Sequence, residues 1–315
     1  MTLPWTVGID IGGSFIKIGL VRGARIIQRR TLPTSPFATP TALLGELERQ
    51  VRTLRPPDRR PVAGVGVGVP GLVRYPEGVV FSCANLPDWR EVPLQRLLQR
   101  RLRLAVKVDN DVNAMTLAEW TVGAGRGVKN LVCITLGTGV GGGLVVDGRL
   151  LRGWKGSAGE IGHWPMGERG PRCSCGETAC LERSLGNREI LRWVRSRLAR
   201  GVRSRIPGLI DRQWDRLQPE VIDRACRLGD PLAIETWRRV GEKMGLALAG
   251  IVNLLNPERI VVGGGIAKAG RWLFTPMRQV VRERAMRDVA KVSIVPAQLG
   301  SAAGLIGAAL LAQEE

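Results

Sequence analysis

The first thirty residues alternate between apolar and polar positions in a pattern that predicts three short strands. TVGIDI, FIKIGLV and RII are rich in β-branched residues, and the glycine-containing segments GGS and RGA separate them. The same plan returns in LVCITL, GTG, VGGGLVV, DGR and LL. The two stretches align without a gap when Ile9 is placed on Ile134 (134 − 9 = 125). This repeat predicts two related α/β lobes.

Helical and strand patterns alternate along the rest of the chain. Thr39-Pro40 marks a helix start, because threonine caps a helix well and proline suits its first turn. VAGVGVGV predicts a buried strand, and AVKVDND predicts a short strand that ends on polar residues, with a helix beginning near Val112. After residue 186 the pattern is mainly helical, apart from the strands RIVVGGGI and VSIVPA.

Strands that alternate with helices predict an α/β fold. We expect residues 1–110 and 300–315 to form a smaller N-terminal lobe, and residues 111–299 to form a larger C-terminal lobe.

The chain is strongly basic, with 47 lysines and arginines against 28 acidic residues and a net charge of +19. The arginines lie in helical runs such as REILRWVRSRLAR, where apolar residues recur at helical spacing. We interpret them as solvated helix faces that attract anionic substrates, and we expect no specific nucleic-acid partner. The start MTLPWTVGIDIGG has no basic or apolar signal region, and no segment is apolar enough to span a membrane, which predicts a cytoplasmic protein.

Two glycine turns are candidates for phosphate binding. Without bulky Cβ atoms, the backbone N–H groups of Gly12-Gly13-Ser14 and of Gly137-Thr138-Gly139 can approach phosphate oxygens closely. Asp10 lies beside the first turn, and a carboxylate there suits Mg²⁺ bound through water. Taken singly, either turn could be an ordinary hairpin connection.

The only histidine and three of the six cysteines fall within a short, glycine-rich loop. His163, Cys173, Cys175 and Cys180 form a three-thiolate, one-imidazole set, which is the composition of a structural zinc site. A redox role is disfavoured because the sequence has no C-x-x-C motif. We expect the scattered Cys83, Cys133 and Cys226 to be buried thiols.

Four motifs in order, DIGGSFIK, VDNDVNAMTLAEW, LGTGVGGGLVVDGRLLRG and GEIGH…CSCGETACLE, closely resemble the ROK family of repressors and kinases. That family lies within the actin-like ATPase and sugar kinase superfamily. The resemblance covers nearly the whole chain. It implies a two-lobed actin-like (ribonuclease H-like) α/β fold with a cleft between the lobes.

The resemblance also implies roles for individual residues. Asp111 would be the general base that takes the proton from a sugar hydroxyl, with Asn110 beside it. From local sequence alone, Asp111 could equally be a helix N-cap. The remaining residues implied to bind the sugar are Gly71, Asn85, Glu160, His163 and Glu182. The residues implied to bind ATP are Asp10, Gly12, Gly13, Ser14, Lys17, Gly137, Thr138, Gly139, Gly264 and Gly265.

Zinc would thus set the shape of the sugar site, because His163 serves both. We expect the nucleotide turns to be independent of it, since they lie elsewhere in the chain. Three departures from the family pattern are Ala179 in place of glycine, Arg183-Ser184-Leu185-Gly186 in place of small residues, and Phe15 in place of threonine or lysine.

The implied activity is ATP-dependent phosphorylation of a hexose at its 6-hydroxyl, with D-glucose favoured and Mg-ATP as donor. Fructose, mannose or N-acetylmannosamine is the alternative substrate. A sugar-sensing repressor of the same family is disfavoured, because Asp10 lies too near the start for a preceding helix-turn-helix domain. An inactive sugar-binding scaffold is disfavoured because Asp111 and both turns are intact. The family also implies a homodimer or homotetramer.

Overall fold

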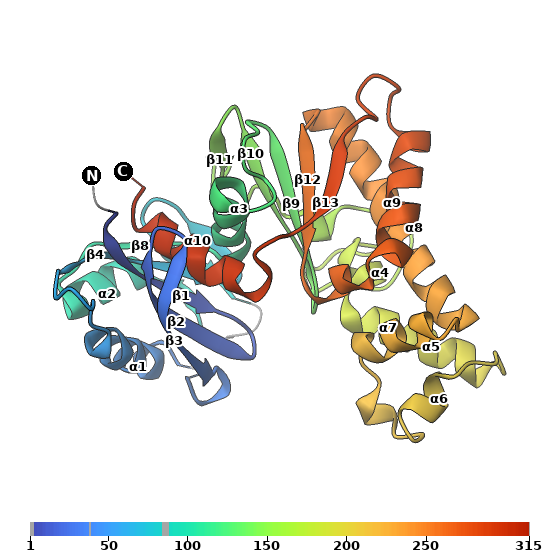
Figure 1. Ribbon diagram of the computed structural model, residues 1–315, viewed down its shortest axis with the longest axis horizontal. Helices are drawn as coiled ribbons and strands as arrows, with labels where there is room; N and C mark the ends of the chain where they lie inside the picture. The colour runs from blue at the N-terminus through green and yellow to red at the C-terminus, as the bar shows by residue number, and fades with distance from the viewer. Residues whose placement is uncertain (1–2, 38, 84–87, 315) are drawn as a thin grey trace. The chain divides into compact units, whose positions relative to one another are not determined.

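The computed structural model describes residues 3–37, 39–83 and 88–314 of the chain (Figure 1). Its contacts divide it into two compact units. Unit 1 comprises Met1–Lys129, Gly143–Gly159 and Gln298–Glu315, and unit 2 comprises Asn130–Gly142 and Glu160–Ala297. Within the described part of the chain, no helix is long and apolar enough to cross a bilayer.

Unit 1 is built on a five-stranded sheet with the order β3-β2-β1-β4-β8. The first three strands are antiparallel neighbours, whereas β4 and β8 run parallel to β1. Its five strands are β1 (Trp5–Ile11), β2 (Phe15–Arg22), β3 (Arg25–Pro33), β4 (Val62–Val69) and β8 (Val106–Asn110). Its helices are α1 (Pro40–Thr53), α2 (Leu94–Leu102), α3 (Asp111–Val122) and α10 (Ala303–Leu311). A small three-stranded sheet joins β5 (Leu72–Arg74), β6 (Val79–Ser82) and β7 (Arg90–Val92).

Glycine on one face of this sheet determines how closely α10 packs. In β4, Val65, Val67 and Val69 are fully buried in a core that also includes leucines of α1 and α2. The glycines between them face the other side, because successive strand residues point to opposite faces. A Cβ atom built on Gly66 would lie 1.7 Å from the carbonyl oxygen of Ala308. In the VAGVGVGV strand, the valines therefore form the face that packs into the core, and the glycines form the face against which the backbone of α10 packs.

A buried glutamate ties α3 to the segment that leads into α10. Glu119 is fully buried, and its carboxylate accepts hydrogen bonds from the N–H groups of Ala124, Gln298 and Leu299 at 2.9, 3.1 and 2.8 Å. These contacts group α3 with unit 1. The units thus differ from the lobes predicted from sequence, which placed residues 111–129 and 143–159 in the C-terminal half.

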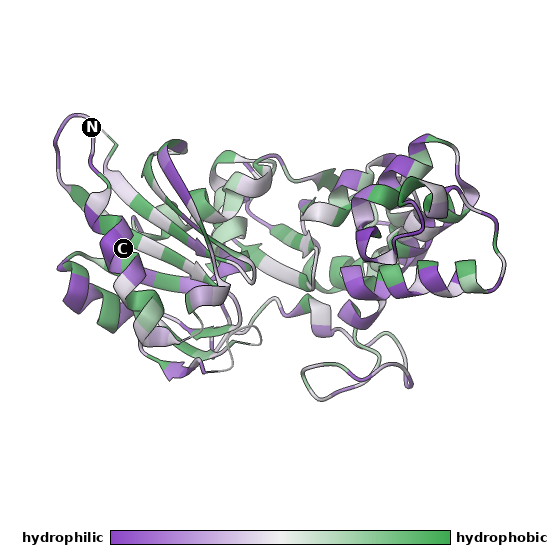
Figure 2. Ribbon diagram, turned by 90° about the horizontal axis from the view of Figure 1, so that it is seen from below, coloured by the Kyte–Doolittle hydropathy of each residue, from purple (hydrophilic) through white to green (hydrophobic). Residues whose placement is uncertain are grey.

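The second sheet has the order β11-β10-β9-β12-β13. Parallel pairing joins β12 to both β9 and β13. Its strands are β9 (Leu131–Leu136), β10 (Val140–Val146), β11 (Arg149–Leu151), β12 (Arg259–Gly263) and β13 (Ser293–Pro296). The helices of unit 2 are α4 (Glu182–Leu185), α5 (Asn187–Ala199), α6 (Ile206–Leu209), α7 (Pro219–Arg227), α8 (Pro231–Leu255) and α9 (Arg271–Arg284). These helices carry alternating hydrophobic and hydrophilic segments, which fits half-exposed amphipathic helices (Figure 2).

The two halves of the sequence repeat form matching hairpins. The first turn covers residues 12–14 between β1 and β2, and the second covers residues 137–139 between β9 and β10. The ends of these strands differ by the predicted offset (136 − 11 = 125 and 140 − 15 = 125). A backbone hydrogen bond of 2.9 Å closes each turn, from Gly12 to Phe15 and from Gly137 to Gly139.

The packing of α10 generates a test with a matched control. Gly66→Ala should lower the free energy of unfolding by more than about 3 kcal/mol, because overpacking by a methyl forces the helix backbone to move. Gly45 is exposed on α1 with nothing within 4 Å of a built Cβ, so Gly45→Ala should stabilise by about 1 kcal/mol. Urea unfolding curves measure both values, and equal stabilities for the two variants would refute the close packing.

Candidate functional site

The junction between β8 and α3 presents Asn110 and Asp111 at the end of a parallel strand. Asn110 is the N-cap of α3, since its Oδ1 accepts from the N–H groups of Val112 and Asn113 at 2.8 and 3.1 Å. Its Nδ2 donates to the carbonyl of Gly71 at 3.0 Å. Asp111 is the first residue of the helix and partly exposed. The capping role that the sequence left open for Asp111 thus belongs mainly to its neighbour.

A partly buried ion-pair network, which the sequence did not indicate, supports this junction. Asp109 is 1% exposed and accepts from Arg152 Nε at 2.6 Å and from Asn113 Nδ2 at 2.9 Å. Arg152 also donates to Glu314 at 2.5 Å and lies over the ring of Tyr75, 3.6 Å from its centroid. The network fixes the strand end that carries Asn110 and Asp111. Its partners are distant in sequence, so no local pattern indicated it.

The first glycine turn lies beside an ion pair. Lys17 Nζ is 2.7 Å from Asp10 Oδ2, and the two residues face each other across β1 and β2. Gly304 of α10 packs against the same carboxylate, because a Cβ there would lie 2.6 Å from Asp10 Cγ. Gly13 and Ser14 are exposed, and buried Thr34 fixes the turn by donating from Oγ1 to the Gly12 carbonyl at 2.8 Å. Thr34 is a further contributor that the sequence did not single out.

The second glycine turn adjoins the end of β12. Gly264 has a φ of +87°, and a Cβ built on it would lie 2.1 Å from the carbonyl oxygen of Leu136. Because β9 and β12 are parallel, their carboxyl ends meet at one edge. Gly137, Thr138 and Gly139 therefore lie next to Gly264 and Gly265 in unit 2. This edge has the exposed, small-residue backbone that a phosphate group requires.

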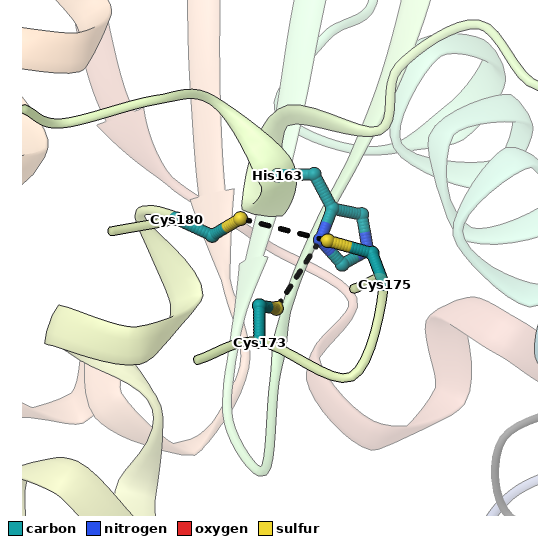
Figure 3. Close-up of side chains that lie close together, drawn as sticks. All are labelled: His163, Cys173, Cys175 and Cys180. Carbon is teal, nitrogen blue, oxygen red and sulfur yellow. Dashed lines mark hydrogen bonds between the residues drawn. The ribbon is translucent and has the colours of Figure 1, made fainter. Parts of the chain in front are cut away.

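The predicted zinc ligands converge. Figure 3 shows His163, Cys173, Cys175 and Cys180 pointing toward one another from the 161–163 turn and the loop that precedes α4. Their ligand atoms all lie within 4.8 Å of one another. His163 Nδ1 is 3.6 Å from Cys173 Sγ, and Cys175 Sγ is 3.6 Å from Cys180 Sγ. Ligand atoms around tetrahedral zinc, with bonds of about 2.0–2.3 Å, lie about 3.5–3.8 Å apart. The two separations of 3.6 Å match this, and the composition of the set suits zinc.

The thiols in this cluster differ in acidity. Burial raises the pKa of Cys173, but hydrogen bonds from Cys175, Cys180 and His163 outweigh it and lower that pKa to about 7. Burial and the neighbouring thiols raise the pKa of Cys180 to about 12. Three adjacent thiolates repel one another, so they ionise together only beside a cation. The donor set is therefore suited to a divalent metal.

The two ring nitrogens of His163 face different groups. Nδ1 faces the cysteines, whereas Nε2 is 3.8 Å from Glu160 Oε2. Partial burial raises the pKa of Glu160, with His163 opposing and Glu182 adding to the rise. Glu182 begins α4, and its Oε2 accepts from the Val140 N–H at 2.9 Å. The nucleotide turns were expected to be independent of the zinc loop because they lie elsewhere in the chain, but this contact brings the second turn against the end of that loop.

Ala179, the departure from the family's glycine, has a φ of +56° and lies in the left-handed region. Phe15 begins β2 and is 56% exposed. Cys83, Cys133 and Cys226 are buried, as predicted. Asn85 lies outside the described residues. Asp10, Asn110 and Asp111 belong to unit 1, and Glu160, His163 and Glu182 belong to unit 2.

Comparisons with known proteins show which family the chain belongs to. The sequence profile of the ROK family matches residues 6–315. The chain belongs to the ROK family. It is 35% identical to a glucokinase of Streptomyces coelicolor over 98% of both chains. It matches the structure of a ROK family glucokinase from Streptomyces griseus in complex with glucose and AMPPNP, with 34% identity, a TM-score of 0.86, and coverage of 99% of this chain and 100% of that one.

The family also contains regulators that are similar to this chain. A xylose repressor of Caldicellulosiruptor bescii is 32% identical over 88% of this chain and 70% of its own length. Family membership therefore establishes the actin-like α/β fold of the sugar kinases. Because the family's kinases and repressors share this fold, the fold does not distinguish between them.

The proposed zinc ligands can be tested without measuring activity. Cys175→Ser should contain less than one zinc per chain, because the softer, tighter thiolate ligand is lost. Cys226→Ser removes a buried cysteine on α7 and should keep full occupancy. Elemental analysis of the purified proteins measures both, and full zinc in Cys175→Ser would refute the ligand set.

The buried network behind Asp111 generates a second test. Arg152→Met should lower the free energy of unfolding by about 3–5 kcal/mol, because it leaves the Asp109 carboxylate buried without its cation. Adding Asp109→Asn should recover much of this loss, since the buried charge is then removed. Thermal unfolding of the single and double variants measures the recovery, and additive losses would contradict the network.

Proposed function

We propose that this protein is an ATP-dependent sugar kinase that phosphorylates a hexose at its 6-hydroxyl, with D-glucose as the preferred substrate. The observation that carries the proposal is the similarity to glucokinases over nearly the full length of the chain. The structure of one of these glucokinases contains bound glucose and AMPPNP. Both glycine turns and the Asn110-Asp111 pair are intact, which supports an active kinase over a scaffold.

Asp111 is proposed to be the general base. Phosphoryl transfer requires little covalent chemistry from a protein, so the main tasks are to align the hydroxyl and to accept its proton. Asn110 caps α3, and the Asp111 carboxylate lies at the helix start, where its Oδ1 accepts from the Val112 N–H at 3.0 Å. The Arg152–Asp109 pair restrains the end of β8. This restraint would help keep the Asp111 carboxylate aligned with the sugar hydroxyl.

The two glycine turns, Gly264 and Gly265 are proposed to hold the nucleotide. Their small residues allow backbone N–H groups to reach phosphate oxygens. Asp10 would hold Mg²⁺ through water, and its partner Lys17 keeps the carboxylate oriented. Magnesium supplies neutralisation of phosphate charge when bound. The excess of arginine favours approach of the anionic nucleotide.

Gly71, Asn85, Asn110, Glu160, His163 and Glu182 are proposed to bind the hexose. Sugar hydroxyls both donate and accept hydrogen bonds, so carboxylates and an imidazole nitrogen are suitable partners. His163 presents Nδ1 to the thiols and Nε2 to the Glu160 side. His163, Cys173, Cys175 and Cys180 would hold zinc, and the bound ion would make the loop rigid.

A sugar-responsive repressor is the second candidate, and the identity to a xylose repressor is the observation in its favour. The two candidates share sugar binding and differ in turnover. A coupled assay with ATP across a panel of hexoses separates them. We expect turnover with glucose well above that with fructose, mannose and N-acetylmannosamine, and sugar binding without any turnover would favour the repressor.

The proposed base has its own test. Asp111→Asn should lower kcat by about 10²–10⁴-fold, because the amide cannot accept the proton. Zinc content, thermal stability and AMPPNP binding should stay close to those of the wild type. Steady-state kinetics measures kcat, and turnover within tenfold of wild type would remove Asp111 from this role.

A further inference from the structure

The end of the metal-binding loop contacts the second glycine turn directly. Glu182 Oε2 accepts from the N–H of Val140, the residue that follows the turn. A Cβ built on Gly139 would lie 2.3 Å from the same oxygen. A side chain at position 139 would therefore displace the Glu182 carboxylate from its present place. A charge-assisted hydrogen bond to backbone is among the stronger contacts that could hold this turn.

Two further contacts fasten the turn to the residues after Glu182. The N–H of Asn187 donates to the carbonyl of Gly137 at 2.9 Å. A Cβ on Gly186 would lie 2.9 Å from the carbonyl oxygen of Thr138. The junction between α4 and α5 thus packs along the whole turn. A shift of α4 would be felt at each of its three residues.

The other end of this connection is the metal site. Cys180 lies two residues before Glu182, and its carbonyl accepts from the Arg183 N–H at 2.9 Å. Leu181 between them is fully buried, and its N–H donates to the Trp164 carbonyl at 2.9 Å, next to His163. No flexible segment separates the Cys180 ligand from the Glu182 carboxylate. Movement of the cysteine would move the carboxylate.

We propose that Glu182 is a positioning residue that couples the metal site to the nucleotide, so that zinc occupancy sets nucleotide affinity as well as the shape of the sugar site. The inference rests on the proposed function, in which residues 137–139 bind phosphate. Loss of zinc releases Cys180, α4 shifts, and the Val140 hydrogen bond that holds the turn is lost. Residues 137–139 are then no longer held in place before the nucleotide binds. Part of the binding free energy is used to order them, and this weakens the affinity.

A mutant cycle tests the coupling by calorimetric titration with Mg-AMPPNP in the absence of sugar. Omitting sugar excludes any direct role of Glu182 in binding a hexose. The proteins are wild type, Cys175→Ser, Glu182→Ala and the double variant. We expect each single variant to raise the Kd by about tenfold, the loss typical of one charge-assisted hydrogen bond. The double variant should show no further rise, because both changes break one connection.

Three controls fix the interpretation. Glu182→Ala should keep full zinc, which shows that the contact rather than the metal has been removed. Glu182→Gln should bind nucleotide nearly as wild type, because its amide oxygen can still accept from Val140. Glu242→Ala removes an acidic side chain on α8 that pairs with Arg238, and it should leave the Kd unchanged. Zinc added back to metal-depleted wild type should restore affinity.

The outcomes are distinct. An unchanged Kd in Cys175→Ser or in Glu182→Ala overturns the coupling and leaves the proposed kinase activity intact. Losses that multiply in the double variant also overturn it, since the metal would then act by another route. A zinc-loaded wild type that binds no Mg-AMPPNP refutes the proposed function itself, and the coupling to nucleotide with it.

Discussion

The convergence of one imidazole and three thiols is the constraint on which the loop from Gly159 to Glu182 depends. The loop from Gly159 to Glu182 contains one short 3₁₀ turn and two isolated β-bridges, and few of its side chains are buried. Such a segment cannot repay its own ordering entropy by hydrophobic burial. A structural metal contributes on the order of 10 kcal/mol in zinc-finger peptides, enough to fix a loop of this kind. In the proposed coupling, the position of Glu182, and through it the turn at 137–139, depends on that loop.

Unit 1 obtains its order differently. Here the Asn110-Asp111 junction is held by a side-chain cap, by a partly buried arginine between two carboxylates, and by close packing of α10 on glycines. Buried ion pairs are costly to desolvate, so their use behind a proposed catalytic residue points to geometric specificity rather than stability. In this account the proposed base is held by a rigid core, whereas Glu160 and His163 are held by a loop that the metal would fix.

Features determined by neighbours in sequence could be predicted. The two hairpins follow from local periodicity and glycine, and the metal ligands follow from composition and spacing. The partly buried contacts between distant residues could not be predicted. Glu182 and Val140 are 42 residues apart, Arg152 and Asp109 are 43, and Arg152 and Glu314 are 162. No periodic pattern encodes such pairs, because they depend on how strands and helices are placed. The cap was ambiguous for a related reason, since Asn110 and Asp111 are both good capping residues.

Amide hydrogen exchange at Val140 tests most directly the claim that the metal site orders the turn, and it requires neither substrate nor turnover. In the zinc-loaded protein, the Val140 N–H is held by Glu182 and should exchange slowly. In metal-depleted protein that keeps its overall secondary structure, the account predicts faster exchange for residues 137–140 and unchanged exchange in β1 and β4. Equal protection of Val140 with and without zinc would contradict the account.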